Sequence, residues 1–303
     1  MSEAVYRLMS NQVEVKPRRM SFPFSSVKTK FFFKDNTLLS TFFTALSSTF
    51  PAGEAEFIES VRLYRDKITD KTLLEQIKGF IGQEGHHSYQ HKRINEHLRT
   101  LGLDAVKLEN HLERDIKRMV SGGRRSNPKV RLAITVAMEH LTAIMAEHML
   151  TNPEVLDSLD SSVQDLLYWH AVEEIEHKAV AFDVYKECEG SEKTLHSAMR
   201  IGTVMFVARL SAYMIALLWW TRTVPGIKDI RGFYSFMFGN KGLISSIRKP
   251  YMQFFKPGFH PWDRDDSHLI EKWKKQLYKP EHDRGSDQFD SELSDITFDA
   301  SAA

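Results

Sequence analysis

Three side chains in the segment WHAVEEIEHKAV, His170, Glu174 and His177, follow one another at offsets of four and three residues. At these offsets they lie along one stripe of an α-helix, because residues three and four apart share a face. Their neighbours are largely apolar, and a buried carboxylate without a partner is too costly to be tolerated. The stripe therefore either faces solvent or lies against a positive group.

A second pair of the same kind lies in the segment FIGQEGHHSYQH, where Glu84 and His87 are three residues apart. Both continue the inner apolar face of a helix predicted over 71–100, and His91 lies one turn further along that face. A single Glu-x-x-His pair arises by chance in long helices. Two such pairs on inward faces, about ninety residues apart, indicate a binding site.

The first predicted helix supplies one inward carboxylate. Glu54 shares the apolar face of this helix, whereas Glu56 and Glu59 lie on the opposite face. Glu54 lies about fifteen residues before the turn near residue 69, and Glu84 lies about fifteen residues after it. In an antiparallel helical hairpin these two residues are predicted to lie level.

The third predicted helix offers both Glu139 and Glu147, and periodicity does not separate them because this helix is apolar on most sides. Height along the bundle does separate them. Glu174 lies about eighteen residues after the turn near residue 155, and Glu139 lies about sixteen residues before it. Glu147 would lie about 12 Å lower at a rise of about 1.5 Å per residue, so Glu139 is the preferred ligand.

Four helices are thus expected to bring seven side chains to one level of one core: Glu54, Glu84, His87, Glu139, His170, Glu174 and His177. One Glu from each of two helices and Glu-x-x-His from each of the other two form the ligand set of di-iron and di-manganese carboxylate bundles. Two divalent cations would neutralise the four carboxylates. Oxygen and imidazole ligands without sulfur favour iron, with manganese or zinc as alternatives. The competing interpretation is a solvated bundle with incidental histidines.

Some polar residues near the predicted ligands could orient them or replace one of them: His91, His140 and Glu147. Ordinary hydrogen-bonded burial explains these three equally well. Glu173 and Glu176 flank Glu174 and are predicted to point outward into solvent, because only Glu174 keeps the spacing to both histidines of the stripe.

The elements that position these residues are helical, since no strand pattern occurs along the chain. Two helices, a long connection with a short helix over 104–119, and two more helices predict an all-α four-helix bundle. The four run over 37–67 with a kink at Pro51, 71–100, 129–150 and 161–188. The predicted organisation is an N-terminal arm at 1–36, the metal-binding bundle at 37–190, a C-terminal helical extension at 191–280 and an acidic disordered tail at 281–303.

One segment of the extension, at 201–220, is apolar apart from Arg209. It packs either against the bundle or in a homodimer interface, or else it contacts a membrane. An arginine in mid-membrane costs about 2.5–3.5 kcal/mol on insertion scales, which the apolar neighbours could outweigh. A membrane contact through 201–220 would favour a lipid-like substrate.

Composition excludes several classes of protein. A hydrophobic content of 42% and a charged content of 27% are typical of a soluble globular chain, and a net charge of +1 gives no reason to expect a nucleic-acid partner. The single cysteine, Cys188, excludes an internal disulfide framework and a thiolate metal cluster. The N-terminal segment lacks the apolar core of a signal peptide. We therefore expect a cytoplasmic protein, at the inner face of the membrane if 201–220 binds there.

Over about residues 40–185 the chain resembles the ferritin-like di-iron superfamily, which implies a ferritin-like bundle with a dinuclear metal centre. In HAVEEIEH, the position of His170 resembles the seven-ligand pattern of the di-iron arylamine N-oxygenases. The segments FPAGE, GQEGHH, WHAVEEIEHK and FHPW also resemble a bacterial family labelled "predicted metal-dependent hydrolase".

Two reactions fit these features. In the first, two ferrous ions reduce dioxygen and oxidise a small or lipid-like substrate, with electrons from a donor. The third histidine favours this reading, because the resembling N-oxygenases carry one. The alternative is hydrolysis by a metal-bridging hydroxide, which needs an acid or an oxyanion-stabilising group that the sequence does not identify. Iron storage without turnover is disfavoured by the additional helices.

Overall fold

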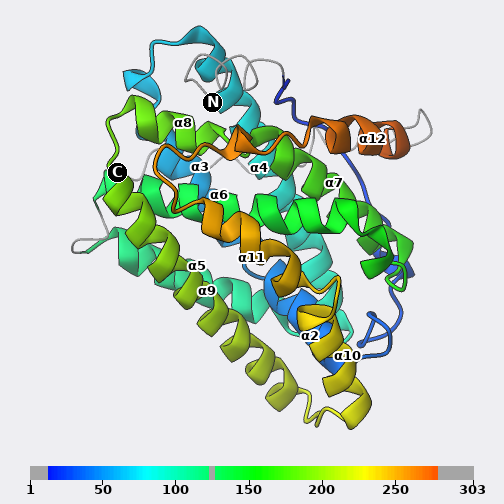
Figure 1. Ribbon diagram of the computed structural model, residues 1–303. Helices are drawn as coiled ribbons and strands as arrows, with labels where there is room; N and C mark the ends of the chain where they lie inside the picture. The colour runs from blue at the N-terminus through cyan, green and yellow to red at the C-terminus, as the bar shows by residue number, and fades with distance from the viewer. Residues whose placement is uncertain (1–12, 123–126, 279–303) are drawn as a thin grey trace.

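Two antiparallel helical hairpins form the centre of the molecule. The computed structural model describes residues 13–122 and 127–278. The helix α3 (Phe50–Arg62) pairs with α4 (Lys71–Thr100), and α6 (Pro128–Thr151) pairs with α7 (Ser161–His177). The helix α5 (Ala105–Val120) lies in the crossover between the hairpins (Figure 1). The predicted all-α fold is confirmed, since no strand occurs in the described ranges.

The helix α4 begins and ends where the sequence predicts. The Asp70 carboxylate accepts hydrogen bonds from the backbone N–H groups of Thr72 and Leu73 and so caps the first turn. At the other end, Gly102 has a φ of 94°, a conformation that suits glycine and stops the helix. Thirty residues of uninterrupted helix therefore hold Glu84 and His87 in one fixed relation.

Two predicted helices are each interrupted. Residues 37–67 form α2 (Thr37–Ser47) and α3 as separate helices, so the kink predicted at Pro51 is a complete break directly before it, at Ser48 and Thr49. Pro51 lies in the first turn of α3, where a proline fits because the first backbone N–H groups of a helix need no internal acceptor. Likewise, 161–188 is divided at Lys178 into α7 and α8 (Val180–Glu187).

Polar residues occupy the space between two apolar clusters. On α4, Ile77 and Phe80 belong to one cluster, whereas Ile94 and Leu98 belong to the other. The buried polar residues Glu84 and His87 lie between these two pairs along the helix. The apolar clusters hold the hairpins together at both ends, and the polar level between them is closed to bulk solvent.

The segment before α2 runs across the outer face of α4. A methyl group added at Gly79 would lie 2.0 Å from the carbonyl oxygen of Val15, and one at Gly82 would lie 2.3 Å from the ring of Pro17. The two glycines therefore allow the segment to contact the helix backbone closely. This contact brings Arg18 over the centre of the bundle.

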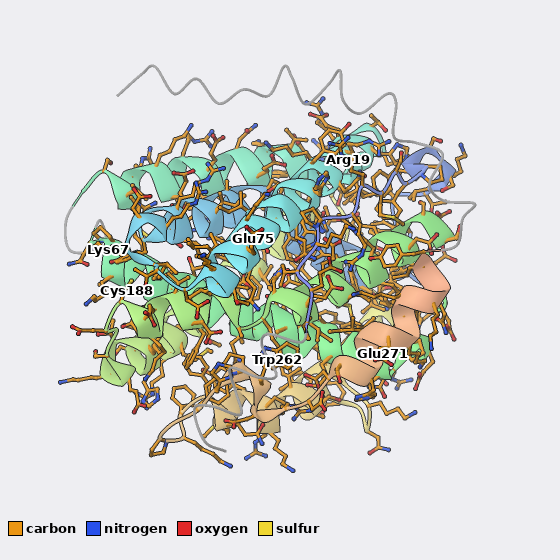
Figure 2. The ribbon with its side chains drawn as sticks, turned by 90° about the horizontal axis from the view of Figure 1, so that it is seen from above. Arg19, Lys67, Glu75, Cys188, Trp262 and Glu271 are labelled. Carbon is orange, nitrogen blue, oxygen red and sulfur yellow. The ribbon has the colours of Figure 1, made fainter. Side chains whose placement is uncertain are left out.

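Up to residue 278, four helices follow the bundle: α9 (Glu192–Trp220), α10 (Ile227–Phe238), α11 (Leu243–Gln253) and α12 (Ser267–Leu277). The helix α9 packs on α6 and α2, α11 packs on α6, and α12 packs on α7. Figure 2 shows Arg19 and Glu271 toward one end of the molecule and Lys67 and Cys188 at the other. The predicted acidic tail at 281–303 lies outside the described residues.

The apolar segment 201–220 was predicted either to pack against the bundle or to contact another partner. One face of this segment packs against the body of the protein, and the other face is exposed. Leu210, Tyr213 and Leu217 are buried against the bundle, whereas Val204, Ile215 and other apolar side chains face outward. The helix is long and apolar enough to cross a membrane by length and composition.

Candidate metal centre

All seven predicted ligands lie together in the buried level between the apolar clusters. Glu54 comes from α3, Glu139 from α6, a Glu and a His from α4, and the remaining three from α7. Each of the seven exposes 4% of its surface or less. The height estimate that preferred Glu139 over Glu147 thus agrees with the positions of these helices.

The ligand atoms form four overlapping groups, and in each group the atoms lie within 4.8 Å of one another. The groups are Glu54–Glu84–His87, Glu84–Glu139–His177, His87–His170–Glu174 and Glu54–His91–His170. The His177 Nε2 atom lies 3.0 Å from a Glu84 oxygen and 3.3 Å from a Glu139 oxygen. Glu84 and His170 are each shared by two groups, and so are Glu54 and His87, which connect those pairs. The whole set is therefore one continuous cluster that can hold more than one metal ion.

Eight of the donor atoms in this cluster lack a hydrogen-bond partner among the described residues. Orphaned buried atoms are one oxygen each of Glu54 and Glu174, both oxygens of Glu84 and Glu139, the Nδ1 of His87 and the Nε2 of His177. A buried polar atom without a partner is costly, and native proteins keep only a few of them. Here several converge on the same space. Metal cations would satisfy all of them at once, so the donor set fits two divalent ions.

His87 and His177 are each held by a hydrogen bond at one ring nitrogen and have no hydrogen-bond partner among the described residues at the other. His87 contacts Glu173 through Nε2 at 3.1 Å, which leaves its orphaned Nδ1 toward the carboxylates. His177 contacts the Gln83 side-chain oxygen through Nδ1 at 2.9 Å, which leaves Nε2. Metal-binding histidines typically donate their second N–H to such a partner, which fixes the tautomer and the ring orientation.

His170 is held by a longer chain of hydrogen bonds. The Ser47 hydroxyl donates its only hydrogen to Asn95 at 2.7 Å, so it must accept from Nδ1 of His91 at 2.9 Å. The Nε2 of His91 is then an acceptor, and it receives the N–H of His170 Nδ1 at 2.8 Å. The Nε2 atom of His170 faces a Glu174 oxygen 2.8 Å away, and a proton or a metal ion must lie between these two atoms because the carboxylate can only accept. His91 therefore orients the ligand His170. It also belongs to the group Glu54–His91–His170, so it is a candidate ligand itself.

Electrostatics at the cluster explain why cations belong there. Burial, reinforced by the neighbouring carboxylates, raises the pKa of Glu54 and of Glu84 well above the usual range. Burial also raises the pKa of Glu139 to about 7, although the nearby His177 opposes this. Burial alone would lower the pKa of His177, but Glu139, Glu174 and Glu84 raise it well above normal. Without added positive charge, the cluster must take up protons to be stable.

The prediction that Glu173 and Glu176 point into solvent is wrong, because both are buried. Arg18 bonds both oxygens of Glu176, at 2.7 and 2.8 Å, and one oxygen of Glu173 at 3.3 Å. Lys274 of α12 adds an ion pair to Glu176 at 2.6 Å. Residue spacing along α7 predicts which side chains share a face, but it does not show whether other segments cover that face. Here Arg18 and Lys274, from segments far away in the sequence, cover the face that carries Glu173 and Glu176.

Two of the predicted supporting residues have partners elsewhere. His140 faces the carbonyl of Pro250 and packs on Phe254. Glu147 pairs with Arg264. Both contacts tie the bundle to the C-terminal segment, so the structure gives neither residue a role in orienting the clustered ligands.

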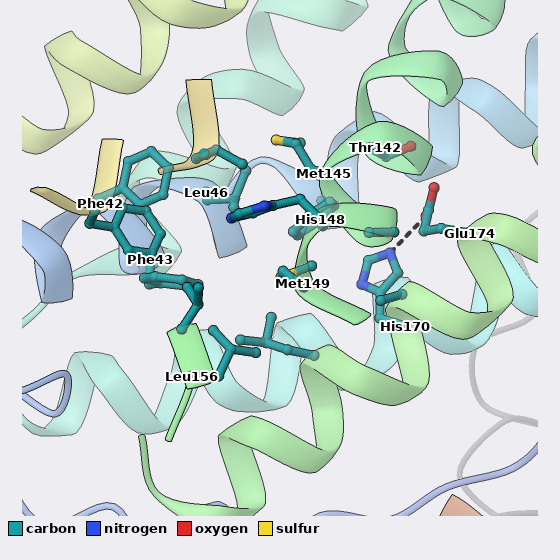
Figure 3. Close-up of a pocket in the computed structure, with 17 residues that line it drawn as sticks. Phe42, Phe43, Leu46, Thr142, Met145, His148, Met149, Leu156, His170 and Glu174 are labelled. Atoms are coloured by element: carbon teal, nitrogen blue, oxygen red, sulfur yellow. Dashed lines mark hydrogen bonds and ion pairs between the residues drawn. The ribbon is translucent and has the colours of Figure 1, made fainter. Parts of the chain in front are cut away.

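A cavity of about 50 Å³ adjoins the cluster on one side. Its wall includes His170 and Glu174 at one end and Phe42, Phe43, Met145 and Met149, with further apolar residues, around the rest (Figure 3). Methionine side chains have three rotatable bonds, so this wall can open without moving the backbone. An apolar molecule would reach the ligands from here.

His148 is a polar exception in the cavity wall. It is 5% exposed, and its Nε2 atom has no partner among the described residues. The Asn152 amide nitrogen lies 3.3 Å from Nδ1 and makes that atom the acceptor. Burial lowers the pKa of His148, so the ring is neutral and its proton lies on Nε2. The cavity therefore offers one N–H donor.

A family model described as "Predicted metal-dependent hydrolase" matches residues 16–265. No curated protein and no solved structure matches the chain. The matched range includes all seven clustered ligands and also Arg18, the cation that pairs with Glu173 and Glu176.

Replacing a predicted ligand should remove metal. We expect His87→Ala or His177→Ala to lower the metal content by at least half, because each shortens the donor set of one metal position. The control is Glu56→Ala, which breaks a largely buried ion pair with Arg131 outside the cluster and leaves the donor atoms of the cluster in place. Elemental analysis of the purified proteins measures this. Equal metal content in all three variants would refute the ligand assignment.

Metal binding should strengthen as pH rises toward 8. The raised pKa values mean that metal-free protein carries protons on Glu54, on Glu84 and, up to about pH 7, on Glu139. A metal must displace these protons. As the pH rises further, these buried groups ionise and destabilise the metal-free fold. The difference in Tm between metal-loaded and metal-free protein should therefore grow from pH 5.5 to pH 8, measured by calorimetry. A constant difference would contradict this electrostatic account.

Proposed function

We propose that this chain, which belongs to the predicted metal-dependent hydrolase family, is a dinuclear-metal enzyme with iron as the preferred metal. It uses dioxygen to oxidise an apolar or lipid-like substrate. The observation that carries this proposal is the buried Glu/His cluster, with its orphaned donor atoms, at the end of an apolar cavity. The sequence resemblance to ferritin-like di-iron proteins supports the same reaction class.

The metals would supply the redox chemistry, and the residues of this chain would control access and orientation. The apolar cavity wall keeps bulk water from the ligands while admitting dioxygen, which is itself apolar. Glu173, Gln83 and His91 keep the three histidines in the tautomers that coordination requires. Incorporation of one oxygen atom also consumes two electrons and two protons to release the second atom as water, so an electron donor is needed.

Hydrolysis is the second candidate, and the description of the matching family favours it. Metal ions can activate water for attack on an ester, amide or phosphate. Such substrates present a polar scissile group, and the cavity wall beside the ligands is almost entirely apolar. His148 supplies one hydrogen-bond donor there. One hydrogen-bond donor in an otherwise apolar wall suits an apolar substrate better than a polar scissile group, and this favours oxidation over hydrolysis.

Metal identity and reaction with dioxygen test the choice. We expect protein produced with iron, manganese and zinc available to bind about two irons per chain. On anaerobic reduction and exposure to dioxygen, it should develop a visible absorption band that His177→Ala lacks. Stopped-flow absorption measures this. Two zinc ions per chain, or an iron protein that stays colourless with dioxygen, would favour hydrolysis.

His148 should favour apolar ligands that carry one hydrogen-bond acceptor. The probe pair is 2-octanone and 2-methyl-1-octene, which differ by replacing the carbonyl oxygen with a methylene group. The native protein should bind the ketone up to about tenfold more tightly, because one buried hydrogen bond contributes about 0.5–1.5 kcal/mol. His148→Leu should lose this preference, whereas His148→Gln keeps a donor and part of it. Thermal-shift titration measures both ligands, and an unchanged preference in His148→Leu would exclude the role.

A further inference from the structure

The outward face of α9 is a continuous apolar stripe. Its most exposed members are Trp219 (81%), Val204 (69%) and Ile215 (67%). Ile201, Val204, Ala208, Ala212, Ile215 and Trp219 recur every three or four residues, so they lie along one side of the helix. At about 1.5 Å per residue the stripe is about 27 Å long. Isolated exposed apolar residues are common in soluble proteins, but a stripe of this length marks a binding surface.

The same surface continues onto the next helix. Beyond Trp219 and Trp220, the linker exposes Val224, and α10 exposes Ile227, Ile230, Tyr234 and Phe238. In Figure 1, α9 forms the outer edge of the molecule and leads directly into α10. We call this combined surface, the outward residues of α9 and α10 with their linker, the α9–α10 face.

Contacts on the opposite side of α9 show that this helix does not cross a bilayer alone. Tyr213 donates its hydroxyl hydrogen to the carbonyl of Leu108 at 3.1 Å. Arg209 forms an ion pair with Asp115 of α5 at 2.9 Å. These polar contacts, together with buried Leu210 and Leu217, attach α9 along its length to the water-facing body of the protein. Only one side of the helix is available to a partner, as in helices that lie in the plane of a membrane interface.

Charge identifies the partner. Between Ile201 and Lys256 the chain has eight Lys and Arg residues and one acidic residue, Asp229, so this segment carries a formal +7 in a chain whose total is +1. Asp115 and Glu154 neutralise Arg209 and Lys241 through ion pairs, which leaves +5. Exposed cations, including Arg222, Lys228 and Arg231, lie in and beside the α9–α10 face. Basic residues next to exposed Trp and Tyr are typical of surfaces that bind anionic lipid headgroups.

The same charge argues against a second copy of the chain. In a two-fold symmetric dimer both subunits contribute the same surface, so two positively charged α9–α10 faces would be brought together. Like charges brought together at an interface oppose association. An anionic surface has the opposite effect, because it neutralises them.

We propose that the α9–α10 face docks this protein onto the surface of an anionic lipid bilayer. The position of the cavity supports this, because Phe236 of α10 and Leu243 of α11 line the cavity that reaches His170 and Glu174. An apolar substrate dissolved in the bilayer would thus enter beside the docked helix. Delivery of the substrate rests on the proposed function, whereas docking itself does not. In a cytoplasmic protein the docked surface would be the inner face of the membrane.

Sedimentation with lipid vesicles tests the proposal on the full-length, metal-loaded protein. Vesicles of phosphatidylcholine with 30% phosphatidylglycerol should bind the protein at least tenfold more tightly than vesicles of phosphatidylcholine alone. The double variant Ile215→Ser/Trp219→Ser should weaken binding at least tenfold, since it removes exposed apolar area. Lys228→Glu/Arg231→Glu should do the same for anionic vesicles only, because each basic residue near such a surface contributes about a fivefold change.

Matched controls separate docking from folding and from the reaction. Leu63→Ser replaces an apolar residue that is 48% exposed outside the α9–α10 face, and it should bind vesicles as the native protein does. Metal content should stay unchanged in every variant. Absence of vesicle binding would overturn the proposal, and so would equal loss of binding in Leu63→Ser. A solution dimer that Ile215→Ser/Trp219→Ser dissociates would assign the face to a second copy instead. None of these results depends on turnover.

Discussion

Burial of four carboxylates within one small space is the constraint on which the rest of the structure depends. Glu54, Glu84, Glu139 and Glu174 are each buried, and their mutual repulsion adds to the cost of removing them from water. Cations are the direct remedy, because they bind the orphaned donor atoms and cancel the charge together. The two hairpins, the apolar clusters above and below, and the hydrogen bonds to the histidines all serve to hold these carboxylates in place.

The surroundings of the cluster are polar on one side and apolar on the other. On the polar side, Glu173 and Glu176 accept hydrogen bonds and ion pairs from Arg18 and Lys274, which come from opposite ends of the described chain. A network of this kind is rigid because each buried charge has a partner. Glu176 holds Gln83, which in turn bonds the ligand His177, and Glu173 bonds the ligand His87 directly. The positions of Arg18 and Lys274 over the bundle therefore affect the orientation of these two ligands.

On the apolar side, the small cavity reaches His170 and Glu174 and shares helix α10 with the outward apolar and basic face. This asymmetry separates two tasks. The polar side orients ligands and resists movement, whereas the apolar side, rich in Met and Phe, can open to admit a ligand. A single N–H donor at His148 would then orient an otherwise apolar molecule. These features are the basis of the proposed oxidation of an apolar substrate, since cleavage of a polar substrate would need more polar groups beside the ligands.

The sequence by itself determined the all-α fold, the bounds of α4 and the residues that meet at the centre. Helical periodicity places side chains on faces, and equal distances from a turn place them at equal heights, so local spacing was sufficient for Glu54 and Glu139. Only the tertiary structure decided the burial of Glu173 and Glu176, the break after α7 and the outward face of α9. Those outcomes depend on Arg18, Lys274 and the packing of one face of α9, which are contacts between distant segments that spacing along one helix cannot encode.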